Sequence, residues 1–209
     1  MHNYVTDFFI IAGLHLLAVM SPGPDFVMVS RNSLIYSRKT GIFSALGLAL
    51  GITVHITYCL IGIAYIISQS VIIFSALKFL GAGYLMYIGY KALRAKPSQA
   101  GETAIEKVDM SKAQALKMGF LTNLFNPKVT LFFLALFTQV IRPDTPLFIK
   151  MAYGLEMATM TFVWFSFVAL ILSHNKVQKP FLRFQHYVER VTGVALIALG
   201  LKVALSGTN

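Results

Sequence analysis

Two short polar breaks interrupt long apolar stretches of this 209-residue chain. The first spans Ser21–Asp25 (Ser-Pro-Gly-Pro-Asp), and the second spans Asn126–Lys128 (Asn-Pro-Lys). Proline lacks an amide donor and clashes with the preceding helical turn, so each break should divide a helix in two. In lipid, backbone groups freed in this way cost several kcal/mol unless protein or water satisfies them. Interrupted helices in corresponding positions of two halves are typical of the binding site of a membrane transporter.

The composition identifies a membrane protein. Hydrophobic residues make up 56% of the chain and charged residues 12%, whereas soluble domains carry about 25% charged residues. The length suits one transmembrane domain over residues 1–209. The formal charge of +10 comes from basic residues in short connections between apolar segments. That pattern is typical of membrane topology and argues against a nucleic-acid-binding face.

Six apolar segments are long enough, or nearly so, for the roughly 20 residues that a membrane span requires. The first and fourth contain the breaks and are too long for one straight helix. We therefore predict an all-α integral membrane protein with six transmembrane helices, of which helices 1 and 4 are broken. The segments lie at about 5–30, 41–66, 71–93, 113–140, 147–172 and 188–206.

The basic residues predict an orientation. Thirteen of the 18 lysines and arginines fall in connections on one side of the six segments, and four fall on the other side. Since cytoplasmic loops carry the excess of positive charge, both termini should lie outside. The polar segment at about 95–111 is then a cytoplasmic linker between halves at about 1–94 and 112–209.

The two halves are similar in sequence. A shift of 103 residues places Gly23-Pro24-Asp25 on Asn126-Pro127-Lys128, and Gly51 on Gly154. Each half holds three spans, an odd number, so the second half must insert upside down relative to the first. This predicts a 3+3 inverted repeat with a pseudo-two-fold axis in the membrane plane.

Asp25 and Lys128 are the leading functional candidates. A charge at the bilayer centre costs at least about 2.5–3.5 kcal/mol on insertion scales, so such residues usually face a cavity or each other. One interpretation is a polar site where broken helix ends meet a substrate's carboxylate and ammonium, with Asp25 or Lys128 binding substrate or taking a proton. The other is a structural ion pair, or charges that reach the interface.

Polar and proline residues beside the breaks complete the predicted site. Asn123 and Asn126 could satisfy freed backbone groups, or they could bind a zwitterion. The remaining members, Pro22, Gly23, Pro24 and Pro127, make the breaks, and glycine also allows close backbone approach.

Titratable residues within the apolar segments provide further candidates. Glu156 and His55 are candidates for proton coupling, because both groups can bind and release protons; a hydrogen-bonded core histidine is the alternative for His55. His15 is expected to pack in the core. A metal or haem site formed by His15 and His55 lacks any clustered ligand motif, and Cys59 is a single cysteine.

Both break motifs resemble those of a known family. Met20–Phe26 resembles the N-terminal signature of the lysine exporter superfamily, in its homoserine/threonine resistance branch, and Gly119–Lys128 resembles its second signature. A third-helix pattern is also similar, at Lys78, Gly81, Tyr84, Leu85 and Gly89. The resemblance covers the whole chain and is nearest to threonine-efflux members. It implies a bacterial inner-membrane exporter of amino acids driven by proton antiport. The motif residues that it singles out are Pro22, Gly23, Pro24, Asp25, Asn126, Pro127 and Lys128.

The breaks and the repeat predict an alternating-access exporter, and the resemblance implies that its substrates are threonine, homoserine or related small neutral amino acids. It would be no enzyme, would need no cofactor, and would have the amino acid, protons and lipid as partners. Asp25 is the first choice for the proton-coupled group and Glu156 the second. The alternatives are an exporter of another small solute or a metal ion, an intramembrane enzyme, and a passive channel. A homodimer would fit the apolar surface, although lipid covers such a surface equally well.

Overall fold

The computed structural model describes residues 3–69, 71–94, 110–139 and 145–205, and every regular element in these ranges is an α-helix. The all-helical prediction is therefore confirmed for the described residues. In chain order the helices are α1 (Tyr4–Met20), α2 (Pro24–Ile35), α3 (Arg38–Gln69), α4 (Val71–Leu93), α5 (Lys112–Leu124), α6 (Pro127–Gln139), α7 (Leu147–Leu172) and α8 (Asn175–Leu205).

Both predicted breaks are present. The axes of α1 and α2 bend by 56°, and those of α5 and α6 bend by 55°. Pro24 is the first residue of α2 and Pro127 the first residue of α6. Proline favours this position, because the first helical residue has no intrahelical acceptor for an amide and the fixed φ suits the helix.

Helix boundaries lie within three residues of the predicted segments except at the end of the first and the start of the sixth. The first segment was expected to end at 30, but α2 ends at Ile35. The fifth segment coincides with α7, and the third coincides with α4. The sixth segment was expected from 188, but α8 begins at Asn175. The hydropathy pattern marks residues that can enter lipid, whereas polar residues can form helix equally well. Most of the predicted linker, residues 95–109, lies outside the described residues.

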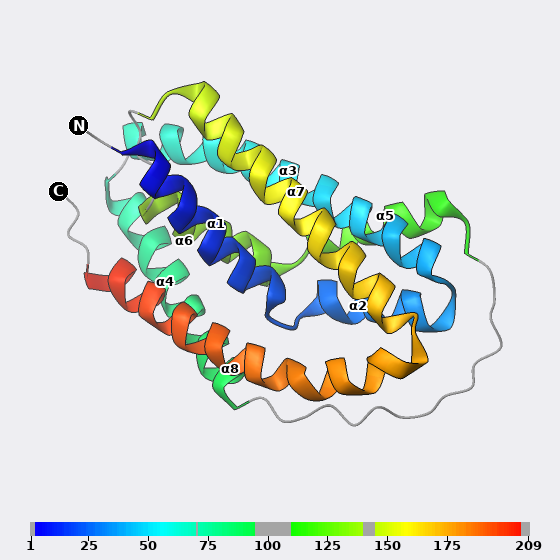
Figure 1. The fold of residues 1–209 in the computed structure, drawn as a ribbon. Helices are drawn as coiled ribbons and strands as arrows, with labels where there is room; N and C mark the ends of the chain where they lie inside the picture. The colour runs from blue at the N-terminus through cyan, green and yellow to red at the C-terminus, as the bar shows by residue number, and fades with distance from the viewer. Residues whose placement is uncertain (1–2, 70, 95–109, 140–144, 206–209) are drawn as a thin grey trace.

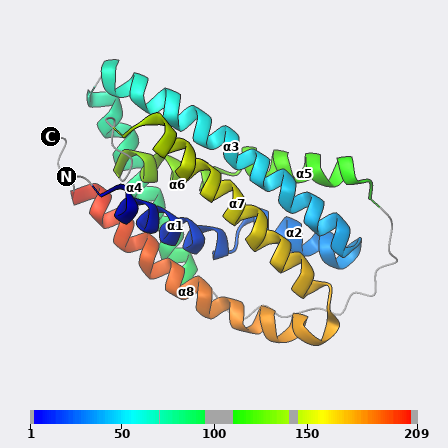
Figure 2. The same cartoon turned by 45° about the horizontal axis from the view of Figure 1, so that its top comes forward.

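Close helix contacts depend on glycine. α3 runs beside α7 and also packs against α5, while α4 packs along α8 (Figures 1 and 2). A Cβ on Gly47 would overlap the carbonyl oxygen of Leu116, and one on Gly119 would overlap that of Ser44. Between α4 and α8, a Cβ on Gly193 would come within 2.6 Å of the Gly89 carbonyl oxygen. These glycines let helix backbones approach more closely than any side chain would allow.

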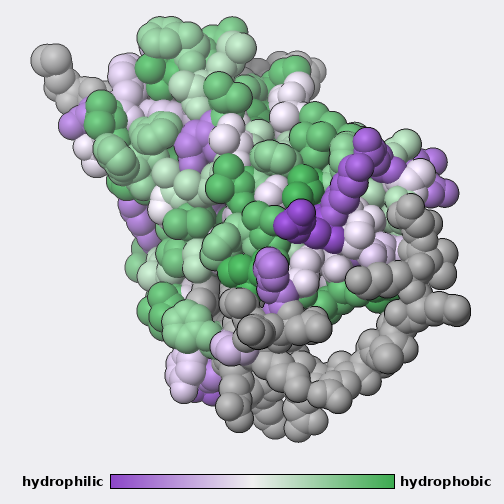
Figure 3. Space-filling view, turned by 45° about the vertical axis from the view of Figure 1, so that its right-hand side comes forward, coloured by the Kyte–Doolittle hydropathy of each residue, from purple (hydrophilic) through white to green (hydrophobic). Residues whose placement is uncertain are grey.

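The arrangement suits a multi-pass membrane protein. Within the described residues, α7 and the Arg38–Ile61 part of α3 are long and apolar enough to cross a membrane, and each bent pair could form one more span. The described start of α1 and end of α8 lie at the same end of the bundle (Figure 1). Figure 3 shows a mostly apolar face, interrupted by hydrophilic side chains at the end turned toward the viewer.

Two apolar clusters form the interior. The larger contains residues such as Ile52, Phe133 and Leu196, from α3, α6 and α8. The smaller contains Phe26 and Phe165, from α2 and α7. The cavity described next is lined from both clusters, so it lies at their junction.

Candidate functional site

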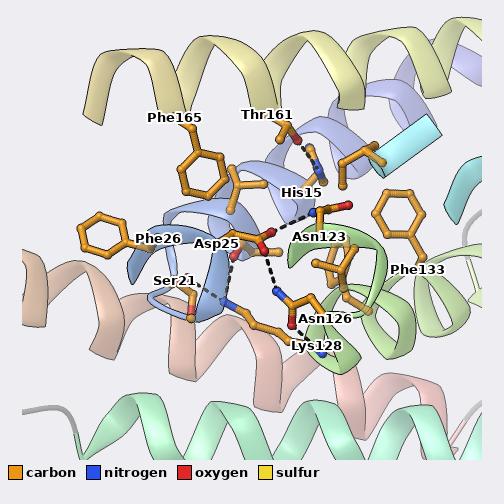
Figure 4. Close-up of a pocket in the computed structure, with 16 residues that line it drawn as sticks. His15, Ser21, Asp25, Phe26, Asn123, Asn126, Lys128, Phe133, Thr161 and Phe165 are labelled. Carbon is orange, nitrogen blue, oxygen red and sulfur yellow. Dashed lines mark hydrogen bonds between the residues drawn. The ribbon is translucent and has the colours of Figure 1, made fainter. Parts of the chain in front are cut away.

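The two helix breaks meet at a small buried cavity (Figure 4). Its volume is ≈ 30 Å³, room for about two water molecules. Polar residues from both breaks line it, together with apolar and aromatic side chains of α1, α2, α3, α6 and α7. The polar lining residues are His15, Ser21, Asp25, Asn123, Asn126, Lys128 and Thr161.

The Asp25 carboxylate is held by both asparagines of the second break. Asn126 Nδ2 donates to Asp25 Oδ1 at 2.9 Å, and Asn123 Nδ2 donates to Asp25 Oδ2 at 2.8 Å. Asp25 is 7% exposed and lies in the first turn of α2, where the helix dipole favours negative charge. The acid of one break thus depends on the amides of the other, although about 100 residues separate them.

Lys128, from the second break, bonds main-chain carbonyls at the first break. Its ammonium donates to the carbonyl oxygens of Ser21 at 2.6 Å, Ala18 at 3.2 Å and Pro22 at 3.4 Å. The Ala18 carbonyl would bond the amide of residue 22 in a continuous helix, and proline has no such amide. Lys128 therefore replaces a donor that the break removes. It also places a cation at the C-terminal end of α1, where the dipole favours positive charge.

Asp25 and Lys128 share the cavity without forming a direct ion pair. Among the described residues, their charged atoms bond to amides and carbonyls respectively, although the two charges act on each other through space. Both residues therefore face one cavity, and the direct ion pair that was the alternative interpretation is not found between them. The Glu189 carboxylate on α8 also acts electrostatically on the Lys128 ammonium.

His55 repeats the pattern at the second break. Its Nε2 lies 3.1 Å from the carbonyl oxygen of Asn123, and its Nδ1 lies 2.6 Å from the Tyr58 hydroxyl. A carbonyl only accepts, so Nε2 must carry the proton, and in the neutral ring Tyr58 then donates to Nδ1. In a continuous helix the Asn123 carbonyl would bond the amide of residue 127, which is proline. It also accepts from the Asn126 amide at 3.0 Å.

The other predicted residues divide into cavity and periphery. Gly23 lines the cavity, and a Cβ there would lie 3.3 Å from Lys128 Cδ. The rings of Pro24 and Pro127 are exposed. Glu156 is not part of the lining, and neither of its carboxylate oxygens has a hydrogen-bond partner within the described part of the chain.

Three polar lining residues were not assigned to the site from the sequence, namely Ser21 in the first break, His15 and Thr161. His15 was expected to pack in the core, and Thr161 was not singled out. Both are fully buried and lie within 3.4 Å of each other, His15 Nε2 to Thr161 Oγ1. The only signal in the sequence is a polar residue within an apolar helix, which does not distinguish a core position from a cavity wall.

Side chains that commonly bind transition metals do not cluster in the described part of the site. No group of three or more His, Cys, Asp or Glu side chains that could hold a metal occurs in the described ranges. His15 and His55 each pack against Phe133, with ring centroids 6.1 and 5.8 Å away. The cavity instead presents carbonyl oxygens that hold an ammonium and amides that hold a carboxylate.

Comparisons with known proteins indicate which family the chain resembles. Residues 16–207 match the family model described as "LysE type translocator". An uncharacterized membrane protein of Bacillus subtilis, YrhP, is 31% identical over 91% of this chain and 94% of its own length. Threonine efflux proteins of Salmonella typhi and Escherichia coli K12 are each 27% identical, over 95% of this chain and 98% of theirs. No solved structure matches.

Proposed function

This chain belongs to the LysE type translocator family, and from that premise we propose that it exports small neutral amino acids, with threonine and homoserine as the first candidates. Members of this family are translocators rather than enzymes. The threonine efflux proteins among the relatives support this substrate class.

The observation that carries the proposal is that one cavity holds partners for both charges of a zwitterion. The carbonyls of Ala18 and Ser21 bind the Lys128 ammonium, and the amides of Asn123 and Asn126 bind the Asp25 carboxylate. An amino acid carries the same two charged groups. Its ammonium would take the place of Lys128 on the carbonyls, and its carboxylate that of Asp25 on the amides.

The cavity volume favours alternating access. With room for about two water molecules, a cavity of ≈ 30 Å³ is too small for an amino acid. The present conformation is then an occluded state, in which the charges of Asp25 and Lys128 are bonded to groups of the protein itself. Opening the cavity to one side would release the internal contacts and expose their partners to substrate. Each such contact joins residues from before and after the linker, so separating the halves breaks them together.

The membrane arrangement that we propose has six spans in a 3+3 inverted repeat, with halves at about 1–94 and 112–209. Bends of 56° and 55° at equivalent positions support it. The excess of basic residues favours both termini outside a bacterial inner membrane.

Asp25 is our first choice for the group that couples export to protons. It is the acid whose partners would be exchanged during transport. Glu156 remains the second choice, because its carboxylate oxygens are buried without a hydrogen-bond partner in the described residues. His55 hydrogen-bonds on both ring nitrogens, which supports a positioning role for it.

The test uses purified protein in liposomes loaded with a panel of amino acids, with and without an imposed pH step. We expect the wild type to export threonine or homoserine faster when protons can move inward. Asp25→Asn should lose the response to the pH step while retaining part of the exchange between labelled and unlabelled substrate, and Glu156→Gln serves as the parallel variant. Coupling like that of the wild type in Asp25→Asn would remove Asp25 from the proton role. Flux that ignores both the pH step and an opposing substrate gradient would indicate a passive channel.

A further inference from the structure

One wall of the cavity carries a polar pair that the contacts between the breaks do not use. His15 comes from α1 and Thr161 from α7, and both are 0% exposed. Thr161 Oγ1 and His15 Nε2 lie 3.4 Å apart, at the long limit of a hydrogen bond. In Figure 4 the pair lies on the side of the cavity away from Lys128.

This wall contains hydrogen-bonding capacity that is not satisfied within the described residues. His15 Nδ1 is buried there without a partner, and His15 lines the cavity. A buried polar atom left without a partner costs about 1–3 kcal/mol. A ligand that brings a hydrogen-bonding group to this wall would recover that free energy.

We propose that His15 and Thr161 form the subsite for the side chain of the transported amino acid, and that this subsite selects a hydroxyl group. The inference rests on the proposed function and adds the residues that read the side chain. A hydroxyl both donates and accepts, so it can pair with His15 Nδ1 in either tautomer of the neutral ring. A methyl group in the same place would leave that nitrogen without a partner.

Position and surroundings fit a short uncharged side chain. His15 precedes Ala18 by three residues, a rise of about 4.5 Å along α1, and the Ala18 carbonyl belongs to the group proposed to bind the substrate ammonium. A hydroxyl on the carbon next to the α-carbon would lie within that reach. The rings of Phe132 and Phe133 pack against His15 with centroids 6.2 and 6.1 Å away. This apolar wall would make a charged side chain costly to bury.

The experiment compares threonine with valine, which replaces the hydroxyl by a methyl group of similar size. Liposomes loaded with both amino acids report the ratio of threonine to valine export. The variants are Thr161→Val and His15→Phe, which remove hydrogen-bonding groups, and Thr161→Ser and His15→Gln, which retain them. We expect the first two to lower the ratio about twofold to tenfold, the effect of one net hydrogen bond. The second two should keep the ratio close to that of the wild type.

An unchanged ratio in Thr161→Val and His15→Phe would overturn the inference while leaving the proposed function intact. A wild type that exports no amino acid of the panel would instead overturn the proposed function. Should a variant fail to fold, the test is the thermal stabilisation of the wild-type protein by threonine and by valine. Threonine should protect at concentrations at least about twofold lower than valine, and equal protection would count against the hydroxyl subsite.

Discussion

At the scale of single residues, the site works by replacing hydrogen bonds that proline removes. Pro22 and Pro127 each deprive a carbonyl four residues earlier of its helical donor. Lys128 bonds the first of these carbonyls, and His55 bonds the second. Each replacement comes from the opposite half of the chain, so the two breaks stabilise each other.

His55 should therefore act as a positioning residue. Its Nε2–H holds the Asn123 carbonyl, and the Asn123 amide holds Asp25. We expect His55→Phe to lower the stability of the purified protein by about 0.5–2 kcal/mol and to slow export. His55→Gln, which can still donate, should recover part of both losses. Thermal unfolding in detergent and export from liposomes provide the two measurements.

The pH response separates this role from proton transfer. If His55 only positions Asn123, export by His55→Gln should remain as responsive to a pH step as export by the wild type. Tyr58→Phe is the matched control, because it removes the partner of Nδ1 and leaves the Nε2 contact. A stable His55→Gln protein whose export ignored the pH step would assign the proton to His55.

At the scale of helices, glycine sets how closely the elements meet around the site. Gly51 lies on α3 against Asn123, the residue that α5 contributes to the site. A Cβ at Gly51 would come within 2.7 Å of Asn123 Oδ1 and 2.8 Å of its Cβ. Asn123 is 0% exposed and bonds Asp25, so it cannot yield without moving the carboxylate's partner.

Gly51→Ala should thus impair transport strongly. Overpacking of this kind costs about 1–3 kcal/mol, and we expect export to fall at least about tenfold. Gly83→Ala is the control, since nothing lies within 4 Å of a Cβ at this exposed helical glycine. It should export as well as the wild type. Equal export by Gly51→Ala and Gly83→Ala would show that the α3 contact with Asn123 does not position the site.

At the scale of the whole molecule, the two ends of α7 report how the protein is oriented in the membrane. Its 26 residues span about 39 Å at the helical rise, enough to cross the hydrocarbon core of about 30 Å. Its first residue, Leu147, is 66% exposed, and the exposed His174 follows its last turn. The two positions should lie on opposite sides of the membrane.

Cysteine labelling tests this orientation in a Cys59→Ala background. Leu147→Cys should react with a membrane-impermeant maleimide in intact cells, because the proposed topology places it outside. His174→Cys should react only with a permeant reagent or after the cells are opened. The reverse pattern would invert the proposed topology, and equal labelling of both would place both ends of α7 on one side.

Much of the architecture could be predicted from the sequence, because hydropathy and proline both act locally. The bends at Pro24 and Pro127 and the ends of α7 follow from such signals. The start of α8 at Asn175 does not, since a polar helix carries no hydropathy signal.

The site was predictable only in part. Asp25 and Lys128 were expected to face a cavity or each other, because a charge inside an apolar segment is costly to expose to lipid. Asp25 bonds asparagine amides and Lys128 bonds main-chain carbonyls. These partners depend on distances in the folded protein, which the spacing of residues in the sequence does not reveal. His15 and Thr161 are single polar residues within apolar helices, and only packing shows that they border a cavity.

The exposed rings of Pro24 and Pro127 have a consequence for the surrounding bilayer. The ring atoms beyond the main chain are hydrocarbon, and proline presents no N–H at the position where a break would otherwise leave one uncovered. Acyl chains that meet the outside of either kink therefore touch methylene groups. The neighbouring side chains of Asp25 and Asn126 are buried on the inner side, so a bent helix can sit in fatty surroundings with hydrocarbon at these two positions of its outer edge.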